Sequence, residues 1–198
     1  MKNQVLVSVL AASIAVTGCS IQSKHEDGSH KENVKIETPL GGMNVRTDDV
    51  DAKETGMTVF PGATPKEKED GDHDEKKANV NIDTPWFGLK VVALTYQSSE
   101  PQEKIWDYYK KEMSRYGKVL ECKPGSPDLN AAAKDDEELT CNDSKKKGHV
   151  RAYERDSKSV QLKVGTANKQ RIVAFKPSGN GTEFSLVYVS TREKKETM

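Results

Sequence analysis

Cysteines and histidines are the side chains of this sequence that most readily form covalent bonds or hold a metal ion. Cys122 and Cys141 lie about 20 residues apart, and a disulfide between them would stabilise the fold by about 3 kcal/mol. The alternative is that the two thiolates bind a metal ion together. No CxxC pair and no Cys/His spacing typical of a zinc site accompanies them. The sequence therefore favours the disulfide and predicts no metal site.

An enzyme would need a nucleophile or a base in a defined setting. The chain contains no G-x-S-x-G elbow, HExxH motif, P-loop or G-x-G-x-x-G turn. His149 is the only histidine after residue 78, where the pattern becomes globular, so it is the single candidate for a general base. We therefore predict a protein that is not an enzyme and has no cofactor. The alternative is an enzyme whose site is assembled from scattered residues, with a concave pocket around His149 or a buried carboxylate pair.

The third cysteine, Cys19, follows an export leader. Residues 5–16 form an apolar run that is too short to span a bilayer, and small residues separate it from the cysteine. The sequence VTGC at residues 16–19 resembles the lipobox of bacterial lipoproteins. The resemblance implies that the signal peptide, residues 1–18, is removed and that acyl chains on Cys19 anchor the protein in a membrane of the cell envelope. The alternative is an ordinary cleaved signal.

Two further expectations follow from this resemblance. The residue after the cysteine is Ser20 and not an aspartate, which in the lipoprotein pattern favours the outer membrane. An even pair of cysteines in an exported protein forms a disulfide by default. The partners expected are the membrane, through Cys19, and a protein of the envelope. Nucleic acid is not expected, because 31 basic and 31 acidic side chains give a formal net charge of +0.

The mature chain begins with segments of different character. Residues 19–32 are almost entirely polar or charged, which predicts a flexible, disordered tether. Residues 33–45 (NVKIETPLGGMNV) recur as residues 79–91 (NVNIDTPWFGLKV). Each copy alternates apolar and polar residues around a Pro/Gly turn, as is typical of a β-hairpin. Residues 33–56 are therefore assigned to a repeat hairpin and an acidic linker, which either docks on the following domain or floats as an arm.

Residues 57–192 are predicted to form one α+β domain, in which one main helix packs on a mostly antiparallel sheet. Residues 193–198 form a charged tail. The helix is expected to begin at a capping serine, Ser99, and to run to about Tyr116, with an aromatic stripe that packs on the sheet. Alternation predicts strands over residues 79–83, 89–96, 118–122, 138–141, 149–154, 160–164, 171–175 and 183–190.

Two aromatic residues, Trp86 and Phe87, stand at the turn of the second repeat copy, where the first copy has Leu40 and Gly41. One interpretation is that both rings fold back onto the core. The other is that they stand out and form part of a protein-binding patch, because exposed aromatic side chains mark interfaces.

The globular part carries a second resemblance. The segment FPGA at residues 60–63, the helix end YYKKEMSRYG at residues 108–117 and the stretch from Gly165 to Phe184 are similar to a family of uncharacterised bacterial exported proteins. This resemblance implies no functional residue. The function expected from the sequence is that of a membrane-anchored envelope lipoprotein, a binding or structural module rather than an enzyme.

Overall fold

The structure is a computed structural model that describes residues 19–25, 32–47, 49–67, 76–123, 139–141, 160–178 and 181–193. The segment predicted to be a signal peptide, the strand predicted over residues 149–154 and His149 lie outside the described residues. Within the described part of the chain, no helix is long and apolar enough to cross a membrane.

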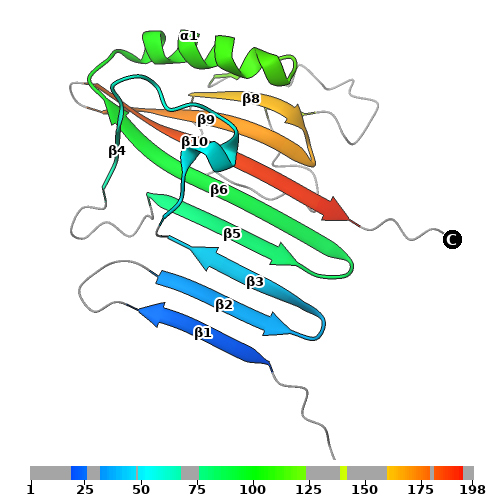
Figure 1. Cartoon of the computed structure of the whole chain (residues 1–198). Coiled ribbons are helices and arrows are strands. Elements are labelled where there is room, and N and C mark those ends of the chain that lie inside the picture. Colours follow the sequence, from blue (N-terminus) through cyan, green and yellow to red (C-terminus); the bar gives the residue numbers. More distant parts are fainter. Residues whose placement is uncertain are drawn as a thin grey trace, which may run out of the picture.

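One antiparallel sheet of ten strands runs through the described residues, and one α-helix packs on it (Figure 1). The strand order is β1-β2-β3-β5-β6-β10-β9-β8-β7, and the short β4 pairs with β6. This architecture confirms the α+β class. The strands are β1 (Ser20–His25), β2 (Glu32–Thr38), β3 (Gly41–Arg46), β4 (Thr64–Pro65), β5 (Lys77–Asp83), β6 (Phe87–Ser98), β7 (Leu120–Cys122), β8 (Val160–Thr166), β9 (Lys169–Ser178) and β10 (Gly181–Glu193).

The two repeat copies lie side by side in this sheet. The first copy forms β2 and β3, the second forms β5 and the beginning of β6, and β3 pairs with β5. Val45 faces Val80 in this pairing, so the second strand of the first copy and the first strand of the second copy extend one apolar row. The first hairpin therefore continues the sheet of the domain. Gly41 permits the close approach of the two turns, because a Cβ at its φ of +136° would lie 2.4 Å from the carbonyl oxygen of Asp83.

The segment after Cys19 differs from the flexible tether that its composition predicts. Residues 20–25 form β1, which pairs with β2 and places Ser20 opposite Glu37. The physical reason is that an edge strand offers unpaired backbone N–H and C=O groups, and a polar segment can satisfy them without an apolar core of its own. No residue separates Cys19 from the first residue of the sheet.

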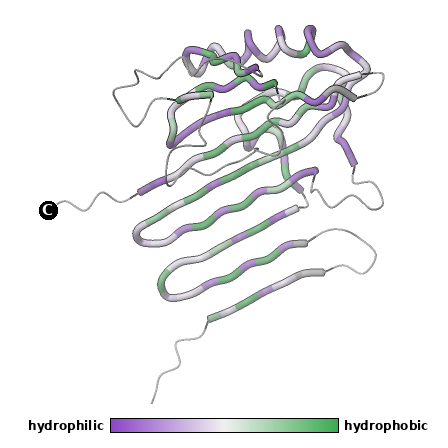
Figure 2. Tube along the Cα trace, turned by 180° about the vertical axis from the view of Figure 1, so that it is seen from behind, coloured by the Kyte–Doolittle hydropathy of each residue, from purple (hydrophilic) through white to green (hydrophobic). Residues whose placement is uncertain are grey.

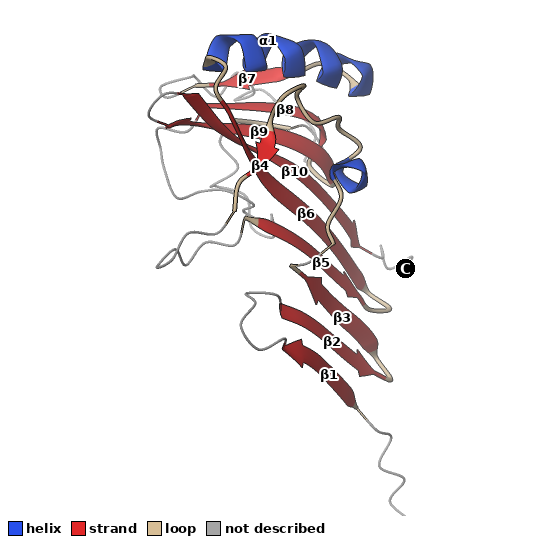
Figure 3. Ribbon diagram, turned by 60° about the vertical axis from the view of Figure 1, so that its left-hand side comes forward, coloured by secondary structure: helices blue, strands red, loops and turns tan. Residues whose placement is uncertain are grey.

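Helix α1 (Gln102–Met113) covers one face of the sheet over β8 and β9 (Figure 3). A short 3-10 helix, η2 (Ser114–Tyr116), continues it. The aromatic stripe is buried at Trp106, Tyr109 and Met113, which confirms that it packs as core. The ring of Tyr109 lies 5.5 Å from that of Phe184 on β10. Other large side chains of this core are Met57, Phe60, Val92, Leu94, Tyr96, Ile105, Leu162, Val164, Val173, Phe175 and Leu186.

The start of α1 differs from the predicted capping box. The N-cap residue is Pro101 in an extended conformation, and no side chain caps the helix. Ser98 accepts a hydrogen bond from the N–H of Glu100 at 3.2 Å, one turn too early to cap it. The prediction of Ser99 as the cap was wrong, because proline fixes φ near −65° and itself supplies the extended residue before the helix.

The acidic linker contains a 3-10 helix, η1 (Ala52–Thr55), which was not predicted from the sequence. Asp51 and Glu54 form a capping box around it, and Ala52 belongs to the buried core under α1. Glu54 also accepts hydrogen bonds from Arg46 at 3.1 Å and from Asn79 at 2.5 Å. Since Arg46 is on the first repeat copy and Asn79 on the second, this carboxylate links both copies to the domain.

Candidate binding surface

The outer strands of the sheet have one apolar face. Residues paired directly across an antiparallel sheet point to the same face, so the register assigns each side chain to a side. Figure 2 shows apolar and polar residues alternating along these strands. Two apolar rows result. One row joins Val34, Val45, Val80, Val91 and Val189, and the other joins Ile21, Ile36, Met43, Ile82 and Leu89.

The opposite face of the same strands is polar. One of its rows joins Lys35, Asn44, Asn81 and Lys90. Lys35 forms an ion pair with Glu37 at 2.7 Å, and Arg192 forms one with Asp83. Helix α1 lies on this side of the sheet, farther along, where the side chains of β6, β8, β9 and β10 become apolar. The outer strands therefore have a hydrophilic side toward the helix layer and a hydrophobic side away from it.

Exposure on the apolar side increases toward the edge of the sheet. Ile172, Val187 and Val189 on β9 and β10 are buried, the side chains on β2, β3, β5 and β6 are half-buried, and Ile21 on β1 is 70% exposed. We define the outer face as the accessible part of this side. It consists of Ile21, Val34, Ile36, Met43, Val45, Val80, Ile82, Leu89 and Val91. It spans five strands, which is about 19 Å at the usual strand spacing.

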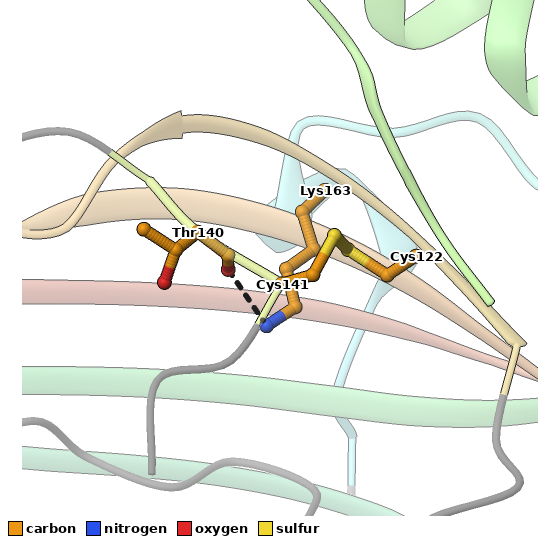
Figure 4. Close-up of a disulfide and its surroundings, with 4 residues drawn as sticks. All are labelled: Cys122, Thr140, Cys141 and Lys163. Carbon is orange, nitrogen blue, oxygen red and sulfur yellow. Dashed lines mark hydrogen bonds between the residues drawn. A yellow bond between two sulfur atoms is a disulfide. The ribbon is translucent and has the colours of Figure 1, made fainter. Parts of the chain in front are cut away.

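The far end of the apolar side is covered by a disulfide-bonded segment (Figure 4). Cys122 on β7 is bonded to Cys141, as expected, and both Leu139 and Thr140 next to it are buried. The Nζ of Lys163 donates a hydrogen bond to the carbonyl oxygen of Thr140 at 3.4 Å. The disulfide thus fixes residues 139–141 against β8, away from the outer face. In the described ranges, no group of three or more His, Cys, Asp and Glu side chains could hold a metal ion.

The structure separates the two aromatic residues of the second repeat turn. Phe87 is half-buried and begins the β6 column of the apolar side, ahead of Leu89 and Val91. Trp86 is 62% exposed at the tip of the turn, so the interpretation that it folds onto the core was wrong. Leu40, at the equivalent position of the first copy, is 63% exposed.

A depression of about 730 Å³ lies between the two turns. It is open, and it is lined by Pro39, Leu40, Gly41, Asp83, Thr84, Pro85, Arg192 and Glu193. Cys19 is exposed and lies at the same end of the sheet, because Ser20 pairs with Glu37 just before the first turn. The lipidation candidate and both exposed turn residues are therefore brought to one end of the molecule.

Tyr109 carries the most strongly shifted ionisable group of the core. Its hydroxyl donates a hydrogen bond to the carbonyl of Thr58 at 3.1 Å and accepts one from the N–H of Phe60 at 3.0 Å. Burial raises the pKa of Tyr109 far above its usual value near 10. With both hydrogen bonds made to the backbone and the ring inaccessible, this residue tethers the 57–60 segment to α1 and does not act as an acid or a base.

No family model, curated protein or solved structure that was compared matches this chain. Cys19, the cysteine pair and the turn aromatics are candidates that the sequence identifies, whereas the outer face as a single surface was not predicted from it. The signal was available in the repeat, because Val34 and Ile36 of the first copy recur as Val80 and Ile82 in the same alternating phase. Only the pairing of β3 with β5 makes these rows continuous.

Proposed function

We propose that this protein is a lipid-anchored protein of the bacterial cell envelope, held in the outer membrane through Cys19, that binds an envelope protein on its outer face. It acts as a binding module and not as an enzyme. The observation that carries the proposal is the outer face itself. A monomer rarely leaves a continuous apolar patch of this kind in water, and such patches mark interaction sites. A partner strand or sheet packed on the two rows would remove them from water.

Three features support the lipid anchor. The VTGC sequence follows an apolar leader, Cys19 is exposed, and the second pair of cysteines is joined in a disulfide, as is typical of exported proteins. The intact mass of protein purified from native membranes tests this part. We expect a chain that starts at Cys19, carries acyl chains and has no free thiol before reduction. An unacylated chain with two free thiols would contradict the anchor and the exported location together.

The binding role predicts that charge on the outer face abolishes partner binding. Replacing Val45→Lys and Val80→Lys together puts two ammonium groups at the centre of one of the two apolar rows, because these residues face each other. We expect recovery of the partner to fall at least about tenfold, since burying these charges costs more than the roughly 1.4 kcal/mol that a tenfold loss represents. The measurement is crosslinking in intact cells from a photoreactive residue at Met43.

A matched control is available on the opposite face. Asn44→Lys and Asn81→Lys also face each other and introduce the same two charges, so partner recovery should stay close to that of the unmodified protein. Thermal unfolding of both double variants shows whether the fold is retained. Equal crosslinking from Met43 on the outer face and from Lys35 on the polar face would contradict a specific partner. Crosslinks between two copies of the chain would identify the partner as the protein itself.

A further inference from the structure

We propose that the turns of the two repeat copies, through Leu40 and Trp86, insert into the membrane interface beside the lipid on Cys19. This inference rests on the proposed lipid anchor and adds to it a defined orientation. The end of the sheet that carries the two turns then contacts the membrane surface. The 98–101 connection, which leads into α1, would face away from the bilayer.

The register fixes the relative height of the three residues along the sheet. Ser20, Glu37, Gly42, Asp83 and Gly88 lie at one level, because each is paired with the next through β1, β2, β3, β5 and β6. Cys19 is one residue beyond this level. The tips of both turns also lie beyond this level, on the same side as Cys19. An acyl chain that enters the bilayer from Cys19 therefore brings both turn tips to the membrane surface.

The lateral distances are also short. The first turn joins β2 to β3 and the second joins β5 to β6, so the two tips are two strand spacings apart, about 10 Å. β1 lies about 17 Å from the second turn by the same spacing. The chain offers no slack between the lipid and the sheet, since β1 begins at the residue after Cys19.

The chemistry of the turns favours a bilayer over a protein partner at this end. The turn sequences, TPLG at residues 38–41 and TPWF at residues 84–87, contain no charged residue. Tryptophan is enriched at membrane–water interfaces, where its apolar ring and N–H fit the headgroup region. Leu40 and Trp86 occupy the same position of the repeat, and both are more than half exposed, although the strands that the two turns join, β2, β3, β5 and β6, bury their apolar side chains at least in part. A second membrane-binding element next to a lipid anchor strengthens and orients attachment.

Tryptophan fluorescence provides a direct test, because the chain has only two tryptophans and Trp106 is buried in the core. The acylated protein with Trp106→Phe is reconstituted into vesicles of phosphatidylethanolamine and phosphatidylglycerol with brominated acyl chains. We expect the emission of Trp86 to shift to the blue and to lose at least about half of its intensity relative to non-brominated vesicles. If Trp106→Phe disturbs the fold, the emission of Trp86 is obtained as the difference in fluorescence between the unmodified protein and Trp86→Leu.

Two variants that move the single tryptophan serve as controls, both in the Trp106→Phe, Trp86→Leu background. Leu40→Trp should be quenched like Trp86. Ser99→Trp is exposed at the other end of β6, about 40 Å away, and should not be quenched.

The outcomes separate this inference from the proposed anchor. Vesicle flotation and intact mass report acylation independently of the fluorescence. An acylated, vesicle-bound chain whose Trp86 is as solvent-accessible as Ser99→Trp would overturn the inference and leave the anchor standing. Protection of Trp86 only after envelope proteins are added would assign the turns to a protein partner and would also overturn it. A chain without acyl chains would overturn both.

Discussion

Replacing Tyr109 by alanine is expected to lower the free energy of unfolding by about 4 kcal/mol. The side chain is fully buried, and its ring lies 5.1 Å from that of Tyr108 and 5.5 Å from that of Phe184. Truncation would leave a cavity between α1 and the sheet and would leave the N–H of Phe60 without its acceptor. Because small domains are stable by only about 5–15 kcal/mol, this variant should unfold at clearly lower urea concentration.

Tyr109→Phe separates the hydroxyl from the ring. It should cost about 1–2 kcal/mol, the penalty for unpaired buried backbone groups. The hydroxyl also gives the unmodified protein a pH dependence that this variant lacks. Burial raises the pKa of Tyr109 in the folded state, so its contribution to stability is complete below about pH 10 and is lost as the pH rises toward the folded pKa.

Urea unfolding between pH 8 and pH 11 measures this effect. The stability of the unmodified protein should fall above about pH 10 by up to about 1.4 kcal/mol per pH unit for this group. The pKa values of Tyr96 and Tyr108 are also raised by burial, so some alkaline loss should remain in Tyr109→Phe. Identical alkaline slopes in the two proteins would contradict the role given to this hydroxyl.

Removal of the disulfide is the second large effect. Replacing both Cys122 and Cys141 by serine should reduce the free energy of unfolding by about 3 kcal/mol, because the bond closes a loop with a sequence separation of 19 in the unfolded chain. The loss should also be local. Residues 139–141 would no longer be held against β8, so hydrogen exchange at the amides of Leu139 and Thr140 should become faster than in the rest of the core.

Cys19→Ser is the matched control for the disulfide variant when unacylated protein is used. Cys19 is exposed and forms no disulfide, so its replacement should leave the unfolding midpoint unchanged. Adding reductant to the unmodified protein should reproduce the loss of stability seen in the double variant. An unfolding midpoint that is insensitive to reductant would show that the bond does not stabilise this fold.

The accuracy of the sequence predictions followed how local each signal was. The structure contains the helix stripe and the alternating strands on both sides of residue 170, which depend on neighbours a few residues away. It also contains the predicted disulfide, for which Cys122 and Cys141 leave only one pairing. The cap at Ser99 failed because the proline beside it competes for the same position. The capping box of Asp51 and Glu54 was not predicted, because a run of acidic residues is equally typical of a linker.

Several properties of this protein were determined by the sequence alone. The VTGC sequence, the even cysteine pair, the balanced charge and the duplicated hairpin are written in residue types and spacing. These features can be recognised without knowing which residues are in contact in the folded protein. They predict where the protein is attached, how it is crosslinked and which segments form strands.

Only the tertiary structure decided which of these strands are neighbours. Alternation says that Val45 and Val80 each lie on one face of a strand, but it does not say that the two strands pair or that the faces coincide. The pairing of β3 with β5 aligns the repeat copies, builds the outer face and puts Leu40 and Trp86 at one end with Cys19. The physical reason is that strand pairing joins segments far apart in the chain through backbone hydrogen bonds, which all residue types can accept and all except proline can donate.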